Sequence, residues 1–212
     1  MIITIFGSTG LVGKELIRHC QNKGYKIRAF GRNVESMIDK DLRDENFEII
    51  KGTVFDEKDI YKAINGSDAV LTALGGAADG VDVTRSLGIK NIIAQMNKAG
   101  VKRIVGVGGI GILNAPESGL VMDAPDFPAQ YFAVSQEHLK AYDLLNASNL
   151  DWTFACPPNI LLKEADGKYK TQADYPASGW EINAGNLAMF MVEELTKNEY
   201  VHHRVGISNT SE

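Results

Sequence analysis

The chain has 212 residues, of which 44% are hydrophobic, and a formal net charge of −5. This fits one globular domain with a sizeable core. The acidic balance, without a basic stripe or a long apolar run, argues against nucleic acid or a membrane as the main partner. Cys20 and Cys156 lie far apart, and the opening letters MIITIF resemble a buried strand rather than a signal peptide. We therefore expect a reduced, cytoplasmic protein.

Short apolar runs alternate with amphipathic stretches along the whole chain. The runs predict strands at Ile2–Phe6, Lys26–Phe30, Phe47–Lys51, Ala69–Ala73, Arg103–Val107 and Trp152–Cys156. The stretches between them predict helices at Leu11–Lys23, Val34–Leu42, Glu57–Ile64, Val83–Ala99 and Ala133–Ala147. Apolar strands joined by helices are typical of a parallel sheet that is covered on both faces. With right-handed crossovers, this pattern predicts a doubly wound α/β fold.

The stretch Gly108–Gln130 has no clear periodicity. Long loops in compact domains are usually functional, and this loop follows the carboxyl end of a predicted strand, where open α/β sheets bind ligands. We expect it to form one wall, or a lid, of a substrate pocket. Phe127, Tyr131 and Phe132 would offer aromatic faces there; the alternative is a surface connection with its aromatic residues in the core.

Three glycines recur at every third position between the first predicted strand and the first predicted helix. Gly7 permits a tight turn, Gly10 lets a pyrophosphate approach the backbone, and Gly13 lets the helix pack on the strand. Ser8 and Thr9 could add hydroxyl donors. Glycine spacing alone also suits a structural turn, but this context favours dinucleotide binding in a Rossmann fold. The expected cofactor contacts of this turn are Gly7, Ser8, Thr9, Gly10, Leu11, Val12 and Gly13.

The second predicted strand ends in AFGRN, with no acidic residue to bind the ribose hydroxyls of NAD. Arg32 in this stretch can bind the 2′-phosphate of NADP(H), so we expect NADP(H) to be preferred over NAD(H). The alternative is a solvated surface arginine. After the third and fourth strands, Thr53 and Val54 could border the adenine, and Leu74 and Gly75 the ribose. Ordinary strand-end turns would place the same residues there.

Several motifs together resemble the short-chain dehydrogenase/reductase superfamily, in its atypical NmrA-like branch. They are GSTGLVG, the arginine after the second strand, and NLDWTFACPPNI at residues 149–160. The segments EHLKAYDLLNASNLDWTFACPPNI and NLAMFMVEELTKNEYVHHRVGIS are most like the biliverdin reductase B/flavin reductase group. The resemblance implies one NAD(P)-binding domain over residues 1–212, with a small substrate-side portion at about 157–212. It also implies cofactor contacts at Val107, Gly108, Gly109, Pro157, Pro158, Asn159 and Ile160.

The chain departs from this superfamily in its catalytic residues. The superfamily serine falls on Gly109, and its tyrosine–lysine pair falls on Val134 and His138. The biliverdin reductase B-like group also lacks the pair, but the missing serine departs even from that group. Its Pro-Pro turn often leads into a histidine, where this chain has Asn159.

These departures make classical alcohol dehydrogenase chemistry improbable, because that chemistry needs a positioned acid. Hydride transfer to a flavin, quinone or tetrapyrrole is less demanding, since the acceptor stabilises the charge and water can supply the proton. His138 could donate a proton or hold a cofactor hydroxyl, or it could be structural. Cys156 could face the nicotinamide, although a core position is the simpler interpretation. The histidines and cysteines have no metal-ligand spacing, so we assign no metal.

The sequence thus predicts an NADP(H)-dependent reductase of a small planar acceptor, acting as a monomer or weak dimer. An alternative is a non-catalytic NADP(H)-binding redox sensor of the NmrA type, which the missing serine favours. The Pro-Pro turn and the long loop favour an enzyme, because a sensor needs no substrate cavity. A sugar epimerase or dehydratase would need the tyrosine–lysine pair and a larger substrate domain.

Overall fold

The computed structural model describes residues 1–77, 79–117 and 119–210. Its strands are β1 (Ile2–Phe6), β2 (Lys26–Gly31), β3 (Phe47–Lys51), β4 (Ala69–Thr72), β5 (Arg103–Val107), β6 (Asp151–Cys156), β7 (Asn159–Leu161), β8 (Tyr169–Ala173), β9 (Glu181–Asn183) and β10 (His203–Asn209). Its α-helices are α1 (Leu11–Asn22), α2 (Val34–Met37), α3 (Glu57–Ile64), α4 (Thr84–Ala99), α5 (Phe132–Asn146) and α6 (Ala184–Lys197). Short 3-10 turns are η1 (Lys40–Leu42), η2 (Ile110–Ile112), η3 (Val121–Asp123) and η4 (Ala129–Tyr131).

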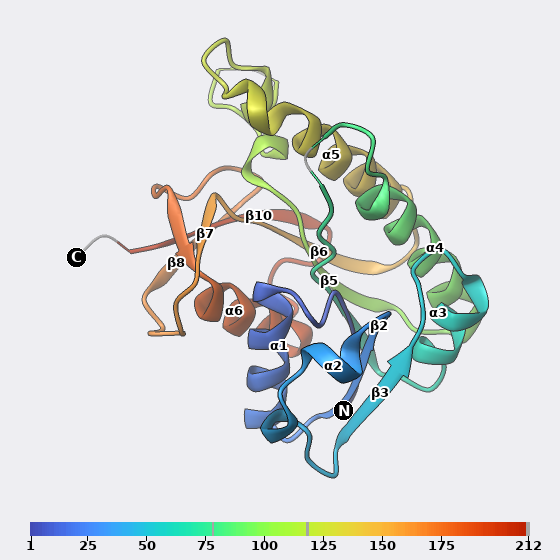
Figure 1. Ribbon diagram of the computed structural model, residues 1–212. Helices are drawn as coiled ribbons and strands as arrows, with labels where there is room; N and C mark the ends of the chain where they lie inside the picture. The colour runs from blue at the N-terminus through green and yellow to red at the C-terminus, as the bar shows by residue number, and fades with distance from the viewer. Residues whose placement is uncertain (78, 118, 211–212) are drawn as a thin grey trace.

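The main sheet has the strand order β3-β2-β1-β4-β5-β6-β10-β8 (Figure 1). Its neighbouring strands pair in parallel, except that β8 runs antiparallel to β10 at one edge. The strand order reverses beside β1, which is where doubly wound sheets open a crevice for ligands. The predicted single-domain Rossmann-like fold is confirmed, and the glycine turn leaves β1 at this crevice.

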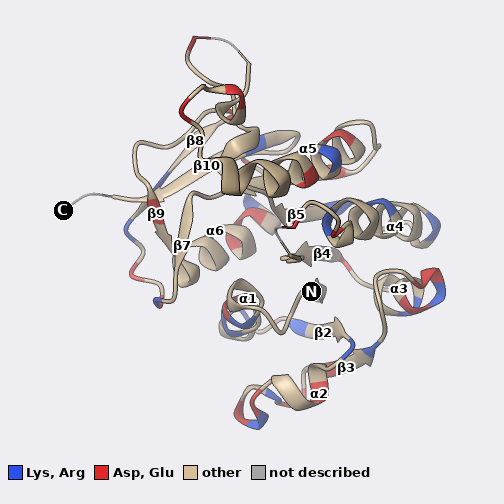
Figure 2. Ribbon diagram, turned by 45° about the horizontal axis from the view of Figure 1, so that its top comes forward, with Lys and Arg blue, Asp and Glu red and all other residues tan. Residues whose placement is uncertain are grey.

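Helices cover both faces of the sheet (Figures 1 and 2). On β1, Ile3 and Ile5 belong to the buried cluster that includes Leu16 of α1 and Leu187 of α6. Phe6 belongs to the cluster that receives α3, α4 and α5. Strand side chains alternate between faces, so a continuous apolar strand supplies both layers.

The predicted helix over residues 34–42 is interrupted. It ends with α2, because Ile38 takes an extended conformation with φ −99° and ψ 126°, and only the turn η1 follows. The Arg43 guanidinium donates hydrogen bonds to the carbonyl oxygens of Glu35 and Ile38. A side chain therefore binds carbonyl groups that a longer helix would have paired with backbone N–H groups.

The C-terminal part adds elements that the strand prediction did not include: the edge strand β8 and the parallel pair β7–β9. Asn186 of α6 is buried, and its Oδ1 accepts the backbone N–H groups of Asp166 and Gly167, each at 3.0 Å. This amide fixes the connection between β7 and β8 against α6. The small β7–β9 sheet is thereby held beside the end of β6.

The stretch Gly108–Gln130, here called the wall segment, contains the turns η2 and η3 and the start of η4. The Asn114 N–H donates to Asp174 O at 2.9 Å. The Arg204 guanidinium donates to Ile112 O and, at 2.8 Å, to Asn114 Oδ1. These bonds tie the wall segment at Ile112 and Asn114 to β10 and to Asp174, the residue after β8. Among the helices that the structure describes, none has the length and apolar character needed to span a bilayer.

Candidate cofactor and acceptor site

The glycine turn contains two positions, Gly7 and Gly13, where the fold itself requires a glycine. At the third position, Gly10, there is room for a side chain within the protein. Gly7 has φ +76°, and a Cβ there would lie 2.3 Å from Ala73 O. A Cβ on Gly13 would lie 2.1 Å from Gly7 O. A Cβ on Gly10 would meet only Gly7 O, at an acceptable 3.4 Å. Gly10 is exposed, so its lack of a side chain keeps space free outside the protein, as a bound pyrophosphate requires.

Helix α1 begins directly at this open position. Gly10 is its N-cap and makes no side-chain cap, and Gly10 O accepts the Lys14 N–H at 3.0 Å. The N–H groups of the first turn therefore lack carbonyl partners within the helix. The first turn has no acidic residue. Free N–H groups and the positive end of the helix dipole suit a phosphate anion.

Ser8 does not have the role that the sequence suggested for its hydroxyl. Ser8 is fully buried, and its Oγ donates to Phe30 O at 3.2 Å. The hydroxyl thus joins the glycine turn to β2 and is not directed at a phosphate, which corrects the expected hydroxyl donor. Thr9 remains partly exposed in the turn.

A pocket of 390 Å³ lies at the ends of β2 and β3, with two cationic side chains in its lining. Arg32 follows β2, and Lys51 ends β3 opposite Gly31 in the parallel register. Neither side chain has a hydrogen bond or ion pair with another described residue. The full lining is Gly31, Arg32, Asn33, Val34, Glu35, Ser36, Ile49 and Lys51. Sequence reasoning missed Lys51, although its place directly before GTVFD was a usable signal.

The predicted adenine and ribose contacts Thr53, Val54, Leu74 and Gly75 follow β3 and β4. Thr53 N–H donates to Asp59 Oδ2 at 3.2 Å, and Val54 O accepts Asn91 Nδ2 at 2.8 Å. Gly75 is exposed, with no atom within 4 Å of where its Cβ would be. The segment after β3 is thus fixed by hydrogen bonds, and Gly75 leaves open space after β4.

The predicted contacts after β5 and β6 lie side by side. Gly108 N–H donates to Ala155 O at 2.7 Å, and Ile110 N–H donates to Pro157 O at 3.0 Å. The carboxyl ends of these strands therefore form one continuous edge. It carries Val107, Gly108, Gly109, Pro157, Pro158, Asn159 and Ile160.

His138 of α5 faces this edge as a neutral side chain. A Cβ on Gly109 would lie 3.1 Å from His138 Cδ2, so the lack of a side chain at Gly109 lets the imidazole approach the backbone. Burial lowers the pKa of His138 to about 3, and the positive charge of Arg85 lowers it further, while Glu137 opposes this shift. His138 Nδ1 is buried without a hydrogen-bond partner in the described ranges. A neutral imidazole cannot act as an imidazolium acid, so the lowered pKa argues against His138 as a charged proton donor.

Arg85, at the start of α4, was not identified from the sequence. Its guanidinium donates to Gly76 O at 3.0 Å and Ala77 O at 3.3 Å. The neighbouring Ser86 donates through Oγ to Glu137 Oε2 at 2.7 Å, which joins α4 to α5. Arg85 thus fixes the connection after β4 near His138.

Cys156 lies in the core. Its Sγ donates to Phe154 O at 3.3 Å, and burial raises the pKa of the thiol to about 12. Cys156 is therefore a protonated core residue, as the simpler interpretation of the sequence held.

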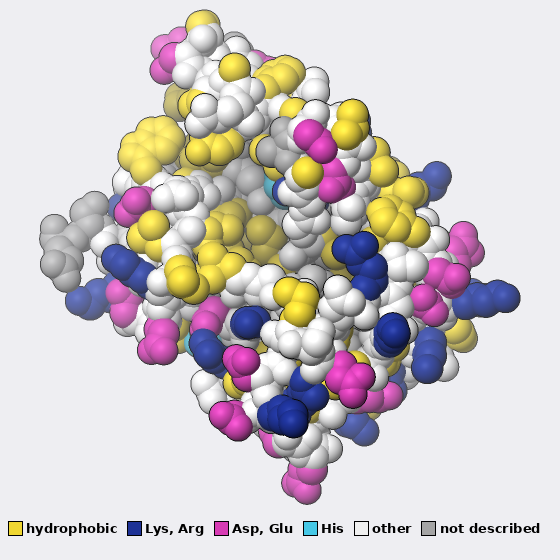
Figure 3. Space-filling view, in the orientation of Figure 1, with side chains coloured by type: hydrophobic (Ala, Val, Ile, Leu, Met, Phe, Trp, Pro, Cys, Tyr) yellow, Lys and Arg dark blue, Asp and Glu magenta, His cyan; other side chains and the backbone are white. Residues whose placement is uncertain are grey.

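The face above the strand ends is hollowed and has hydrophobic side chains on its walls (Figure 3). Tyr131 and Phe132, at the start of α5, are 53% and 42% exposed. Phe127 is more covered and packs near Gly111, where a Cβ would lie 3.3 Å from its ring. Trp180, directly before β9, is 78% exposed.

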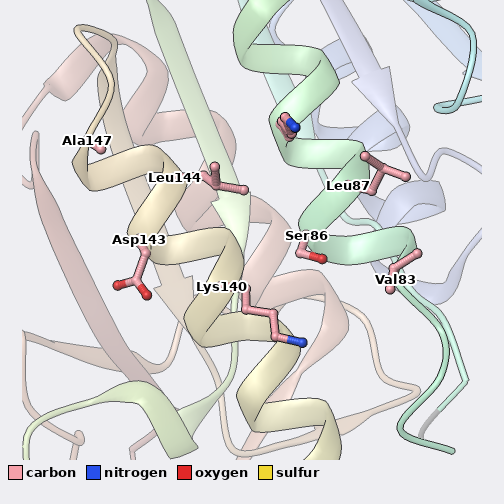
Figure 4. A pocket seen from close by; sticks show the side chains of 8 residues that line it. Val83, Ser86, Leu87, Lys140, Asp143, Leu144 and Ala147 are labelled. Atoms are coloured by element: carbon pink, nitrogen blue, oxygen red, sulfur yellow. The ribbon is translucent and has the colours of Figure 1, made fainter.

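A second pocket, of 580 Å³, is a groove between α4 and α5 (Figure 4). Val83, Ser86 and Leu87 come from the start of α4 and the residue before it, and Lys140 and Leu144 from α5. Its lining contains none of the predicted cofactor or acceptor contacts. The larger of these two pockets therefore lies apart from the expected chemistry.

Comparison with known proteins agrees with this geometry. The chain is 26% identical to YwnB, an uncharacterised protein of Bacillus subtilis (strain 168), over the whole of both chains. It is 25% identical to the oxidoreductase ylbE from Lactococcus lactis, with a TM-score of 0.82 over 100% of this chain and 92% of that one. A Streptococcus pneumoniae TIGR4 protein, provisionally described as an NADH-flavin reductase, shares the fold at 24% identity and a TM-score of 0.79, over 99% of this chain and 100% of that one.

The decisive match is to a family model described as NAD(P)H-binding, which covers residues 7–198 and so begins at the first glycine of the turn. On the evidence of that match and of the cradle at the head of α1, the chain belongs to the NAD(P)H-binding family.

Proposed function

We propose that this chain is an NADPH-dependent reductase that transfers a hydride directly to a planar conjugated acceptor such as a flavin, quinone or tetrapyrrole. One observation carries the proposal. At the edge formed after β5 and β6, Gly109 and a neutral His138 stand where the resembled superfamily has a serine and a lysine. Such an arrangement suits only a reaction that needs no acid from the protein. Within the family, we place the chain in the NmrA-like branch, near the biliverdin reductase B-like group.

The residues present fit NADPH. The open position at Gly10 and the free N–H groups of α1 would hold the pyrophosphate. Arg32 and Lys51 would bind the 2′-phosphate, because two cations without partners among the described residues share its pocket. The edge formed by Gly109 and Pro157 would position the nicotinamide.

When bound, NADPH supplies the hydride. The chain would position the two reactants. The strand ends would hold the nicotinamide, and the hollow and the wall segment would hold the acceptor ring against it. His138 stays neutral and keeps its place against Gly109. The proton reaches the acceptor from water, since a conjugated acceptor spreads the charge that it gains. The oxidoreductase description of the Lactococcus lactis protein supports this class of reaction.

A non-catalytic NADP(H) sensor is the second candidate, and the glycine in place of the serine favours it. The exposed aromatic side chains of Tyr131 and Phe132 favour the enzyme, because a sensor has no need to hold an acceptor ring.

The two candidates differ in steady-state NADPH oxidation with riboflavin, FMN, a quinone and biliverdin. A reductase oxidises NADPH with at least one of these acceptors, at a rate proportional to protein concentration. Tight NADPH binding without oxidation by any of them would refute the reductase and support the sensor.

A further inference from the structure

The two ring nitrogens of His138 differ in their access to solvent. Nδ1 is buried and has no hydrogen-bond partner among the residues that the structure describes. Nε2 has no hydrogen bond to a described residue either, but Nε2 is not buried, and the side chain as a whole is partly exposed. Nε2 is therefore the atom through which His138 can meet water or a ligand.

The accessible nitrogen lies on the side of the imidazole that faces the segment after β5. A Cβ on Gly109 would lie 3.1 Å from His138 Cδ2 and 3.6 Å from Nε2, so this side of the ring is turned to Gly109. The centroid of the Phe154 ring, in β6, lies 6.4 Å from that of the imidazole. Histidine surface is visible inside the hollow above the strand ends (Figure 3). Nε2 therefore opens at the edge where the nicotinamide and the acceptor are proposed to meet.

Glu137 and Arg85, whose charges act on the imidazole, are both bound to other groups. Glu137 Oε1 accepts a hydrogen bond from Lys140 Nζ at 2.8 Å, and Oε2 accepts one from Ser86 Oγ at 2.7 Å. The Arg85 guanidinium donates to two carbonyl oxygens of the segment after β4. Neither side chain is hydrogen-bonded to His138 in the described part of the chain, so Nε2 is available to a ligand.

The burial of Nδ1 indicates which nitrogen carries the proton. Buried N–H groups without an acceptor are rarer in proteins than buried acceptors without a full set of donors. A proton on Nδ1 would place such an unpaired N–H group in the interior. With the proton on Nε2, the N–H group lies on the accessible side of the ring, where water or a ligand can accept its hydrogen bond. His138 therefore presents a hydrogen-bond donor to the hollow.

We propose that His138 donates a hydrogen bond from Nε2–H to a carbonyl oxygen of the acceptor, so that the site takes rings whose carbonyl group is conjugated with the reacting position, as in flavins and quinones. The inference rests on the proposed function for the hydride transfer. The hydride brings an electron pair and a hydrogen to the ring, part of the negative charge moves onto the carbonyl oxygen, and a proton from water completes the reduction. The imidazole keeps its own proton, and its N–H group stabilises the charge.

His138→Gln and His138→Leu form a matched pair of variants, because the glutamine amide offers an N–H donor and leucine does not. With riboflavin as the acceptor, we expect kcat/KM to fall about three- to tenfold in His138→Leu, as the loss of one hydrogen bond predicts. His138→Gln should retain most of the wild-type value, and NADPH affinity should be unchanged in both variants. Gln136→Leu removes an exposed amide from the opposite side of α5 and should change nothing.

Two spectra of the wild-type protein test the inference even if His138→Leu does not fold. In the NADP⁺-saturated protein, nitrogen NMR should show the proton of His138 on Nε2. Binding of riboflavin to the same protein should lower the stretching frequency of a riboflavin carbonyl group in the infrared spectrum, and His138→Leu should abolish that shift.

A proton on Nδ1, an unshifted carbonyl band, or no riboflavin binding overturns the inference. Equal kcat/KM in wild type and His138→Leu, or equal losses in the two variants, also overturns it. A loss confined to NADPH affinity would assign the N–H group to a cofactor hydroxyl instead. A shifted carbonyl band without NADPH oxidation would refute the reductase and leave this inference standing, whereas oxidation with an unchanged kcat/KM in His138→Leu would do the reverse.

Discussion

Arg204 of β10 donates a hydrogen bond at 2.8 Å to Oδ1 of Asn114, which lies 90 residues earlier in the wall segment. The same guanidinium lies over the Tyr142 ring, 4.6 Å from its centroid. Arg204 is 7% exposed, so these contacts form in a largely buried environment. The position of the wall segment therefore depends on the last strand of the sheet.

Asn114→Ala should weaken the acceptor site and leave the cofactor site intact. Removing a hydrogen bond to a charged group costs about 1.5–3 kcal/mol, so the free energy of unfolding should fall by that order. We expect the KM for the acceptor to rise severalfold at unchanged NADPH affinity. Asn97→Ala, at an exposed position of α4, is the control. Equal losses of acceptor and NADPH affinity would show that the wall segment has no separate role.

Gly10→Ala and Gly13→Ala should fail in different ways. A methyl group at Gly10 has room in the protein but enters the space assigned to the pyrophosphate. That variant should fold normally and lose NADPH affinity at least tenfold. A methyl group at Gly13 would lie 2.1 Å from Gly7 O, so that variant should be destabilised by about 1–3 kcal/mol or more. Thermal unfolding and calorimetric titration separate the two effects. Full NADPH affinity in Gly10→Ala would refute the cradle.

Arg32 and Lys51 should together set the preference for NADPH over NADH. We expect a preference of roughly ten- to thirtyfold in the wild type, because charge-assisted hydrogen bonds to a half-open site are at the lower end of their usual strength. Each single alanine variant should lose part of the preference, and the double variant nearly all of it, with little change in NADH affinity. Lys23→Ala, an exposed cation after α1, is the control. Equal affinities of the wild-type protein for NADPH and NADH would refute the proposed preference for NADPH.

His138 should make the protein sensitive to acid. Its pKa is about 3 in the folded chain and 6.5 in the unfolded one. As the pH falls below 6.5, the unfolded chain gains a proton that the folded chain does not, so stability is lost. Between pH 7 and pH 5 this loss amounts to about 2 kcal/mol. Denaturant titrations should show a smaller loss for His138→Gln.

The same variant tests the source of the proton. Because His138 is neutral throughout the working range, kcat/KM should show no inflection from it between about pH 5 and pH 9. The kcat of His138→Gln should change less than tenfold. A hundredfold loss in the folded variant would mean that His138 delivers the proton.

Local pattern was enough to predict much of the fold. Apolar strands such as β1 and β5 can be recognised from their own residues. The glycines between β1 and α1 can be recognised from the strand and helix patterns on either side of them. Edge strand β8 has a sequence, YKTQA, without an apolar run, so its strand character comes from pairing with β10. The helix predicted over residues 34–42 was too long: Ile38 is extended, and Arg43, a residue outside the predicted helix, binds the carbonyl groups of Glu35 and Ile38.

The candidate site likewise contains residues whose role the local sequence indicates and residues whose role only the folded structure reveals. Arg32 and Lys51 both have a usable local signal, the end of a predicted strand, but only the parallel register shows that Lys51 lies opposite Gly31 and so beside Arg32. Ser8 was assigned a hydroxyl role that burial against Phe30 excludes. The accessibility of His138 Nε2 depends on how α5 meets the end of β5, which no local pattern encodes.

The central claim is direct reduction of a planar acceptor by NADPH held in this site, and an anaerobic single-turnover experiment tests it most directly. NADPH-saturated protein in excess is mixed with riboflavin, and both absorbance changes are followed together. The account predicts that NADPH is oxidised and riboflavin reduced in equal amounts, far faster than without protein, and that NADPH deuterated at the transferred position slows the reaction. If riboflavin binds while bound NADPH persists at the protein-free rate, the chain is not a reductase of this acceptor class.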